Sequence, residues 1–134
     1  LCQLDKLDSN NQIRVNNFKY FVENLNFEKF YTDFEMDGQS NYAFIVIMKE
    51  ADFEMRHLLE TTLKHNGIEF RRGLSGGGNQ LRQPFFKNKL KEHELYENFS
   101  NVEHVHNFSW YIGNYPTLEI EKIDNLLGLL NGYK

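Results

Sequence analysis

One apolar run, from Tyr42 to Met48, constrains the fold of this chain more than any other feature. It is rich in aromatic and β-branched residues and too short for a typical helix, so it predicts a strand over 41–49 that is buried on both faces. Asp52 then offers an N-cap for a helix, and Asn66-Gly67 offers the residues that end it. A buried strand followed directly by a helix is therefore expected near the middle of the chain.

Hydrophobic periodicity predicts the remaining elements. Helices carry apolar residues at intervals of three and four, and the polar stretch 9–12 allows a break in the first of them. The order of elements predicts an α+β fold, with a small three-stranded, mainly antiparallel sheet and helices packed on one face. The expected elements are a helix over 4–25, a half-buried strand over 68–71, a strand over 107–112, and a helix from Thr117 or Glu119 to Leu130.

Composition excludes several classes of protein. The 134 residues suffice for one ordinary domain, and the formal charge of −4 argues against a protein whose main partner is nucleic acid. Cys2 is the only cysteine, which suits a reducing cytosol and excludes a disulfide framework. No apolar run approaches the roughly 20 residues of a membrane span, so no membrane partner is expected.

The stretch 71–86 contains three consecutive glycines, Gly76 to Gly78, among hydrogen-bond donors. It lacks the lysine of a P-loop and the spacing of a dinucleotide-binding loop. Glycines allow positive φ or close approach of the main chain to another body, and arginine forks suit phosphate or carboxylate. The stretch therefore predicts an anion-binding surface, and the alternative is a surface linker with incidental charge. The candidate donors are Arg71, Arg72, Asn79 and Arg82.

Two other groups of residues have both a functional and a structural interpretation. His104 and His106 would lie on one face of a strand, as metal ligands need, but no third ligand has a suitable spacing, so a structural or solvent-exposed pair is favoured and no metal site is predicted. Trp110 and Tyr111 beside Gly113 could stack on a base or sugar, although core packing is the commoner role of such aromatics.

Four segments, in this order, resemble the C-terminal part of one enzyme family. The segments are 3–8 with Arg14, 66–72, 78–86 and 110–116. The chain is similar to the DegT/DnrJ/EryC1/StrS group of sugar aminotransferases, which use pyridoxal phosphate on nucleotide-linked 4-keto sugars. Gly78-Asn79 with Arg82-Gln83-Pro84, and Tyr111-Ile112-Gly113 with Tyr115-Pro116, are most similar to the 3-dehydratase branch that makes 3-deoxy sugars for lipopolysaccharide.

The resemblance implies the aspartate-aminotransferase fold, known as fold type I, with a large cofactor domain and a small C-terminal domain. Residues 1–27 would be a long helix leading in from a missing large domain, and 28–134 would be the small domain. The cofactor acts as an electron sink so that a proton can leave the carbon next to nitrogen. The lysine or histidine that serves this chemistry lies upstream in the family, so no residue here is expected to be catalytic. The chain alone is expected to be inactive and to bind no cofactor.

The resemblance also implies a role for the glycine stretch in shaping the cleft for a nucleotide sugar. Asn79 and Arg82 are the first candidates for substrate binding, and Arg71, Arg72, Gly77 and Gly78 are the second. The parent is expected to be a cytoplasmic enzyme of O-antigen sugar biosynthesis. A homo-oligomer is expected because Leu4 and Leu7 would be uncovered without the large domain. The alternative is a non-catalytic module that binds an anionic partner through the glycine-rich loop.

Overall fold

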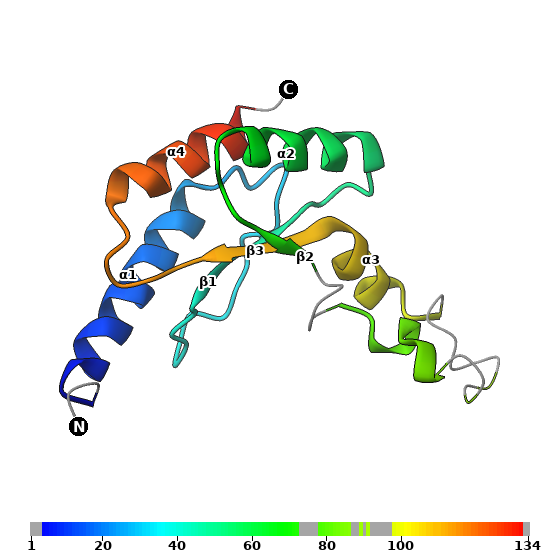
Figure 1. The fold of residues 1–134 in the computed structure, drawn as a ribbon, viewed down its shortest axis with the longest axis horizontal. Coiled ribbons are helices and arrows are strands. Elements are labelled where there is room, and N and C mark those ends of the chain that lie inside the picture. The colour runs from blue at the N-terminus through cyan, green and yellow to red at the C-terminus, as the bar shows by residue number, and fades with distance from the viewer. Residues whose placement is uncertain (1–3, 73–77, 87–88, 90, 92–97, 133–134) are drawn as a thin grey trace.

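The computed structural model describes residues 4–72, 78–86, 89, 91 and 98–132. Four α-helices and three strands dominate these residues, so the expected α+β class is confirmed (Figure 1). Short 3-10 helices, labelled η, occur before α1 and in the segment after the glycines. In chain order the elements are η1 (Leu4–Lys6), α1 (Leu7–Asn24), β1 (Ala43–Ile47), α2 (Phe53–His65), β2 (Arg71–Arg72), η2 (Gln80–Arg82), η3 (Pro84–Phe86), α3 (Ser100–Phe108), β3 (Ser109–Gly113) and α4 (Ile120–Asn131).

The sheet has the order β1-β3-β2, and both pairs are antiparallel. Across the three strands, Ile45 lies opposite Tyr111, which lies opposite Arg71. In the next row, Val46 lies opposite Trp110, which lies opposite Arg72. Because side chains alternate between the two faces of a strand, these two rows belong to opposite faces of the sheet.

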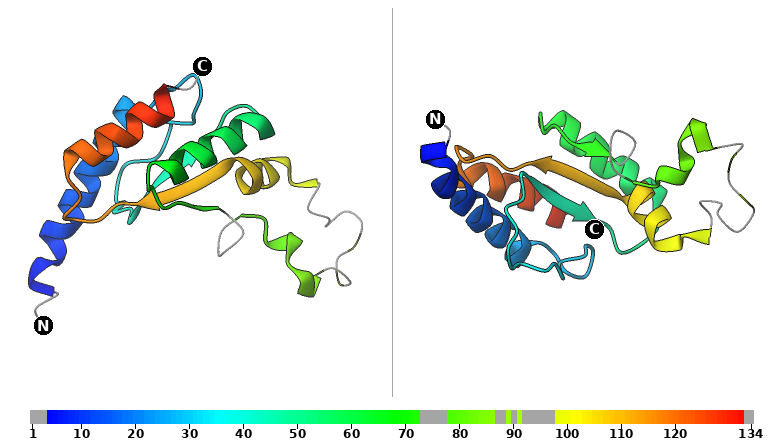
Figure 2. Two further views of the ribbon diagram at one scale, coloured as in Figure 1. Left: turned by 45° about the horizontal axis from the view of Figure 1, so that its top comes forward. Right: turned by 90° about the horizontal axis from the view of Figure 1, so that it is seen from below.

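The face that carries Phe44, Val46, Trp110 and Ile112 is buried against helices. Figures 1 and 2 show α1, α2 and α4 gathered on this side, while α3 continues from the end of β3. The helices contribute the aromatic and aliphatic side chains that fill the core. These are Phe18, Phe21, Leu59, Leu63, Ile123, Leu126, Leu127 and Leu130.

Two local predictions about α2 are confirmed. The Asp52 carboxylate accepts hydrogen bonds from the backbone N–H groups of Glu54 and Met55, each at 2.9 Å, which is the N-cap arrangement. At the other end, Gly67 has a φ of +69°, so the chain leaves the helix through a left-handed residue. Both ends of α2 are thus fixed by residues that the sequence alone identifies.

Other element boundaries differ from the prediction. The helix α1 runs through 9–12 without a break. The strand expected over 68–71 is confined to Arg71–Arg72, since only these residues pair with β3. The strand expected from Asn107 begins at Ser109, because a helix, α3, occupies Ser100–Phe108. His104 and His106 therefore lie on a helix, where an i, i+2 spacing does not place two side chains on one face.

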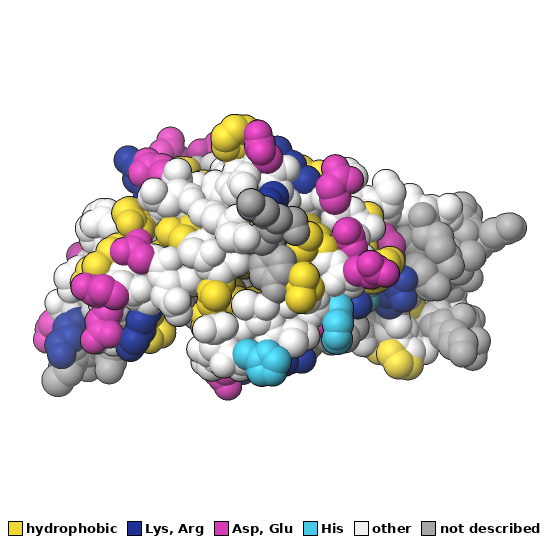
Figure 3. All heavy atoms as spheres, turned by 90° about the horizontal axis from the view of Figure 1, so that it is seen from above, with side chains coloured by type: hydrophobic (Ala, Val, Ile, Leu, Met, Phe, Trp, Pro, Cys, Tyr) yellow, Lys and Arg dark blue, Asp and Glu magenta, His cyan; other side chains and the backbone are white. Residues whose placement is uncertain are grey.

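The outer surface over α2 and α4 carries acidic and basic side chains interspersed, with no continuous basic patch among the side chains drawn in colour (Figure 3). Such a surface lacks the footprint that binding to a phosphate backbone needs. Within the described ranges, no helix combines the length and the apolar character that crossing a membrane would require.

Candidate functional site

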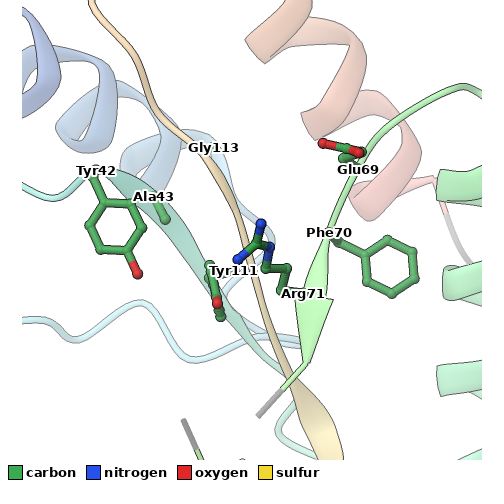
Figure 4. A pocket seen from close by; sticks show the side chains of 7 residues that line it. All are labelled: Tyr42, Ala43, Glu69, Phe70, Arg71, Tyr111 and Gly113. Carbon is green, nitrogen blue, oxygen red and sulfur yellow. The ribbon is translucent and has the colours of Figure 1, made fainter. Parts of the chain in front are cut away.

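The face of the sheet away from the helices holds a groove of about 370 Å³. A volume of this order suits a small ligand. Figure 4 shows its lining, which comes from the start of β1, the approach to β2, and β3. The residues that line the groove are Tyr42, Ala43, Glu69, Phe70, Arg71, Tyr111 and Gly113.

The alternation of side chains along β2 decides which face of the sheet each residue in and before this strand occupies. Arg71 shares a row with Tyr111 on the open face, whereas Arg72 shares a row with the buried Trp110. In Figure 4, Glu69 and Arg71 project from one side of their segment and Phe70 from the other. Phe70 packs against the core, where the Lys64 ammonium lies 5.6 Å from its ring centroid. The two adjacent arginines therefore cannot serve one ligand.

Arg72 is held inside the fold. Its Nε lies 3.4 Å from Glu60 Oε1, and the same oxygen lies 3.9 Å from Arg56 Nε and accepts a hydrogen bond of 3.0 Å from Trp110 Nε1. Arg71, by contrast, is exposed, and no other described residue forms a hydrogen bond or an ion pair with its side chain. Its guanidinium remains able to bind a ligand in the groove.

Asn79 and Arg82 meet in a second cluster, which we call the α3 clamp: Asn79, Arg82, Glu103, His106 and Asn107. The Glu103 carboxylate accepts hydrogen bonds from Asn79 Nδ2 at 2.9 Å, Asn107 Nδ2 at 2.9 Å and Arg82 Nε at 2.7 Å. Arg82 adds a second, short contact through an Nη atom. The Asn79 backbone N–H donates to His106 Nδ1 at 3.1 Å. The clamp ties η2 to α3.

The charge states of the clamp residues are complementary. Burial acts to raise the pKa of Glu103, but the hydrogen bonds from Arg82, Asn79 and Asn107 outweigh it and hold that pKa below its usual value. Burial lowers the pKa of His106, and the positive charge of Arg82 lowers it further. Both shifts favour an ionised Glu103 and a neutral His106, which is the state that accepts the Asn79 N–H.

The remaining predicted site residues differ in burial and in their hydrogen-bond partners. Asn79 is only 3% exposed and satisfied by the clamp, whereas Arg82 is partly exposed beside Glu103. Gly78 has a φ of +82°, which explains a glycine there, and Gly77 lies outside the described residues. The interpretation of His104 and His106 as a structural pair fits their contacts, since His104 Nε2 lies 2.6 Å from the Met48 carbonyl oxygen. Within the described ranges, no three metal-ligating side chains come together.

Sequence reasoning missed Glu103 and His106 as partners of Asn79. Their spacing of three would have placed them on one face if the helix over 100–108 had been recognised. Tyr111 was considered as a stacking residue, and it is the member of its pair that reaches the groove, while Trp110 is buried in the core.

Solved structures with a similar fold include sugar-modifying enzymes, although the sequence matches no family model and no curated protein. The GDP-4-keto-6-deoxy-D-mannose-3-dehydratase of E. coli matches with a TM-score of 0.71 and 25% identity over 96% of this chain and 32% of that one. A protein of Streptococcus pneumoniae assigned as a sugar aminotransferase gives a TM-score of 0.78 and 16% identity, over 98% of this chain and 32% of that one. A DegT DnrJ EryC1 StrS aminotransferase from Brucella abortus gives a TM-score of 0.73 and a sequence identity of 15%, over 97% of this chain and 32% of that one.

The ligands in these structures differ from one crystal to the next. The E. coli dehydratase contains hydrated pyridoxal phosphate, another form of the dehydratase contains a trapped PLP–glutamate geminal diamine, and a variant contains GDP-perosamine. The chain spans about a third of the length of the proteins it matches. Over nearly its whole length, then, this chain has the fold of a part of the DegT/DnrJ/EryC1/StrS-type sugar aminotransferases and of the related GDP-sugar 3-dehydratase.

Proposed function

We propose that the chain is the C-terminal small domain of a pyridoxal-phosphate-dependent enzyme that acts on nucleotide-linked 4-keto-6-deoxy sugars, as an aminotransferase or a 3-dehydratase. Residues 1–27 lead in from a large domain, and 28–134 form the small domain. The parent works in the cytoplasm in the synthesis of lipopolysaccharide sugars. The observation that carries the proposal is the match of 96% of this chain to one third of a GDP-sugar dehydratase.

The residues that line the groove do not fit the reactive end of the cofactor. None of the seven residues that line the groove is a lysine, so none of them can form an imine with pyridoxal phosphate. Pyridoxal phosphate would act as an electron sink when bound to the parent. The chain's own part is to close over that cofactor, exclude water and position the sugar nucleotide.

The α3 clamp supports a positioning role for the segment that follows the glycines. Glu103 holds both Arg82 and Asn79, so the guanidinium is presented from a fixed segment rather than from a free loop. Arg82 keeps about a third of its side chain exposed at the surface of the clamp, where a substrate group could reach it. Arg82 thus remains the first candidate for direct contact with the nucleotide sugar, with Asn79 as the buried residue that positions it.

The experiment begins with the coding sequence upstream of Leu1. A large domain with a lysine or histidine at the cofactor position is expected, and the complete protein should carry the visible absorbance of pyridoxal phosphate. Incubation with GDP-4-keto-6-deoxymannose and glutamate should give either an amino sugar or a 3-deoxy sugar. An initiator codon close to Leu1, or a complete protein without cofactor, would instead favour a non-catalytic module that binds an anionic partner.

A homo-oligomer follows from the same proposal. Leu4 and Leu7 are 66% and 46% exposed in the described chain, which leaves apolar surface along the first helix. The chain alone should self-associate through it. A clean monomer at high concentration by light scattering would contradict this expectation.

A further inference from the structure

We infer that the groove on the open face of the sheet binds a nucleoside diphosphate, with the phosphoryl oxygens on Arg71, a sugar hydroxyl on Glu69 and the ring of the base or sugar against Tyr42. The inference rests on the proposed function and deepens it, because it assigns the nucleotide end of the substrate to the groove. It also separates that end from Arg82, which lies in the α3 clamp.

Arg71 supplies the anion-binding group. Its guanidinium offers a planar fork of donors that matches phosphoryl oxygens. Its neighbour Arg72 is occupied by Glu60, whereas Arg71 has no ion-pair partner among the other described residues. The open face therefore presents one arginine whose charge the fold itself does not neutralise.

Glu69 makes a bare inorganic anion a poor match for this groove. Its carboxylate lies on the same side of the segment as Arg71 (Figure 4), and the two side chains form no ion pair with each other in the described part of the chain. A free carboxylate repels phosphate but accepts hydrogen bonds from sugar hydroxyls. An arginine with a separate carboxylate beside it suits a ligand that carries a phosphoryl group and hydroxyls together.

Tyr42 and Tyr111 add a surface for a ring. Their ring centroids lie 6.2 Å apart with an interplanar angle of 74°, so the edge of one ring faces the other. Tyr42 is 70% exposed, which leaves its outer surface uncovered by the rest of the described chain. An aromatic ring held by its neighbour and open on its far side is a stacking platform, and every nucleobase has a flat face to place on it.

The test is a titration of the 134-residue chain, followed by the amide resonances of Arg71, Tyr111 and Gly113. The probes are GDP, inorganic pyrophosphate and glutamate. GDP should shift these resonances saturably, with a dissociation constant of about 1 mM or below. Pyrophosphate should bind more weakly, because it has neither hydroxyls nor a ring, and glutamate should not compete.

Three variants locate the contacts. Arg71→Gln should weaken GDP about tenfold or more, since it removes a charge-assisted contact. Lys49→Gln removes the same charge at the far end of β1 and should leave the affinity for GDP within about twofold of that of the unmodified chain. Glu69→Ala should weaken GDP but strengthen pyrophosphate, a pairing that general unfolding would not produce.

The inference is overturned if GDP causes no saturable shift up to about 10 mM, if Arg71→Gln and Lys49→Gln weaken it equally, or if glutamate binds as tightly as GDP. The proposed function fails by a different result, the lack of cofactor and product in the complete protein. The two failures are therefore distinguishable.

Discussion

The α3 clamp and the open-face groove differ in how the chain satisfies their charged groups. In the clamp, Glu103 accepts hydrogen bonds from Asn79, Arg82 and Asn107, and His106 accepts another from the Asn79 backbone. In the groove, Arg71 faces solvent beside Glu69 and two tyrosines. One cluster stabilises the fold through its own contacts, and the other leaves its donors available.

The comparison shows that one feature of the sequence, the donors around the glycines, corresponds to two separate clusters in the structure. Arginines and an amide around a run of glycines suggested one anion-binding surface. Strand register instead sends Arg71 and Arg72 to opposite faces, and a helix later in the chain supplies partners for Asn79 and Arg82. Whether a donor is free depends on residues that are distant in sequence.

The largest effect is expected from Glu103→Ala, which should lower the free energy of unfolding of the chain by about 2–3 kcal/mol. The change leaves the buried Asn79 amide and the Arg82 guanidinium without their shared acceptor, and an unsatisfied buried donor is costly. Urea denaturation followed by far-UV circular dichroism measures it.

Glu23→Ala is the matched control for that variant, because Glu23 pairs with Lys19 on the exposed surface of α1. It should change the free energy of unfolding by no more than about 0.5 kcal/mol. Equal losses in the two variants would mean that the clamp contributes no more than a surface ion pair.

The next effect concerns substrate. In the complete enzyme, Arg82→Ala should raise the KM for the nucleotide sugar about tenfold or more, as expected for the loss of one charge-assisted contact. Asn107→Ala is the control, because it removes a hydrogen bond to Glu103 without touching the guanidinium. If KM is unchanged in Arg82→Ala, Arg82 is not in the site. If both variants raise KM equally, Arg82 acts only through the clamp.

The sequence predicted the elements whose signals are local. β1 is a continuous apolar run, and both ends of α2 are fixed by residues adjacent to it, Asp52 and Gly67. It did not predict α3, whose buried residues include His106. A histidine is buried there because its acceptor nitrogen meets the Asn79 N–H, 27 residues earlier in the chain. No periodicity within 100–108 carries that information.

The candidate site also has one part that local sequence predicts and one part that depends on distant residues. The residue types around the glycines were identified, but their partners were not, because pairing with β3 sets which side chain of 69–72 faces the groove. Tyr42 belongs to a run that the sequence predicts to be buried on both faces, but it precedes the first residue of β1 and is 70% exposed.

A smaller effect should appear as a pH dependence of stability. Burial lowers the pKa of His106 in the folded state below the ordinary value of 6.5, so the unfolded chain binds a proton that the folded chain resists. Stability should be insensitive to this group above pH 6.5 and should fall as the pH decreases below it. Glu103 contributes in the same direction only at lower pH, because its own pKa is lowered from 4.5.

Urea denaturation at pH 7.5 and 5.5 measures this dependence. His106→Asn should reduce it, since an amide oxygen can accept the Asn79 N–H without titrating. His57→Asn, which changes an exposed histidine of α2, should preserve it. The assignment to His106 is wrong if both variants keep the same dependence.

The smallest effect is the one that separates the two regions most directly. Arg71→Gln should change the free energy of unfolding by no more than about 0.5 kcal/mol, because its side chain has no partner in the rest of the described chain to lose. Arg72→Gln should cost about 1 kcal/mol, since it removes a cation from the largely buried Glu60. Two adjacent arginines on one short strand provide the closest matched pair in the molecule. If Arg71→Gln destabilises as much as Arg72→Gln, Arg71 is a structural residue, and the open face has no unpaired cation with which to bind a ligand.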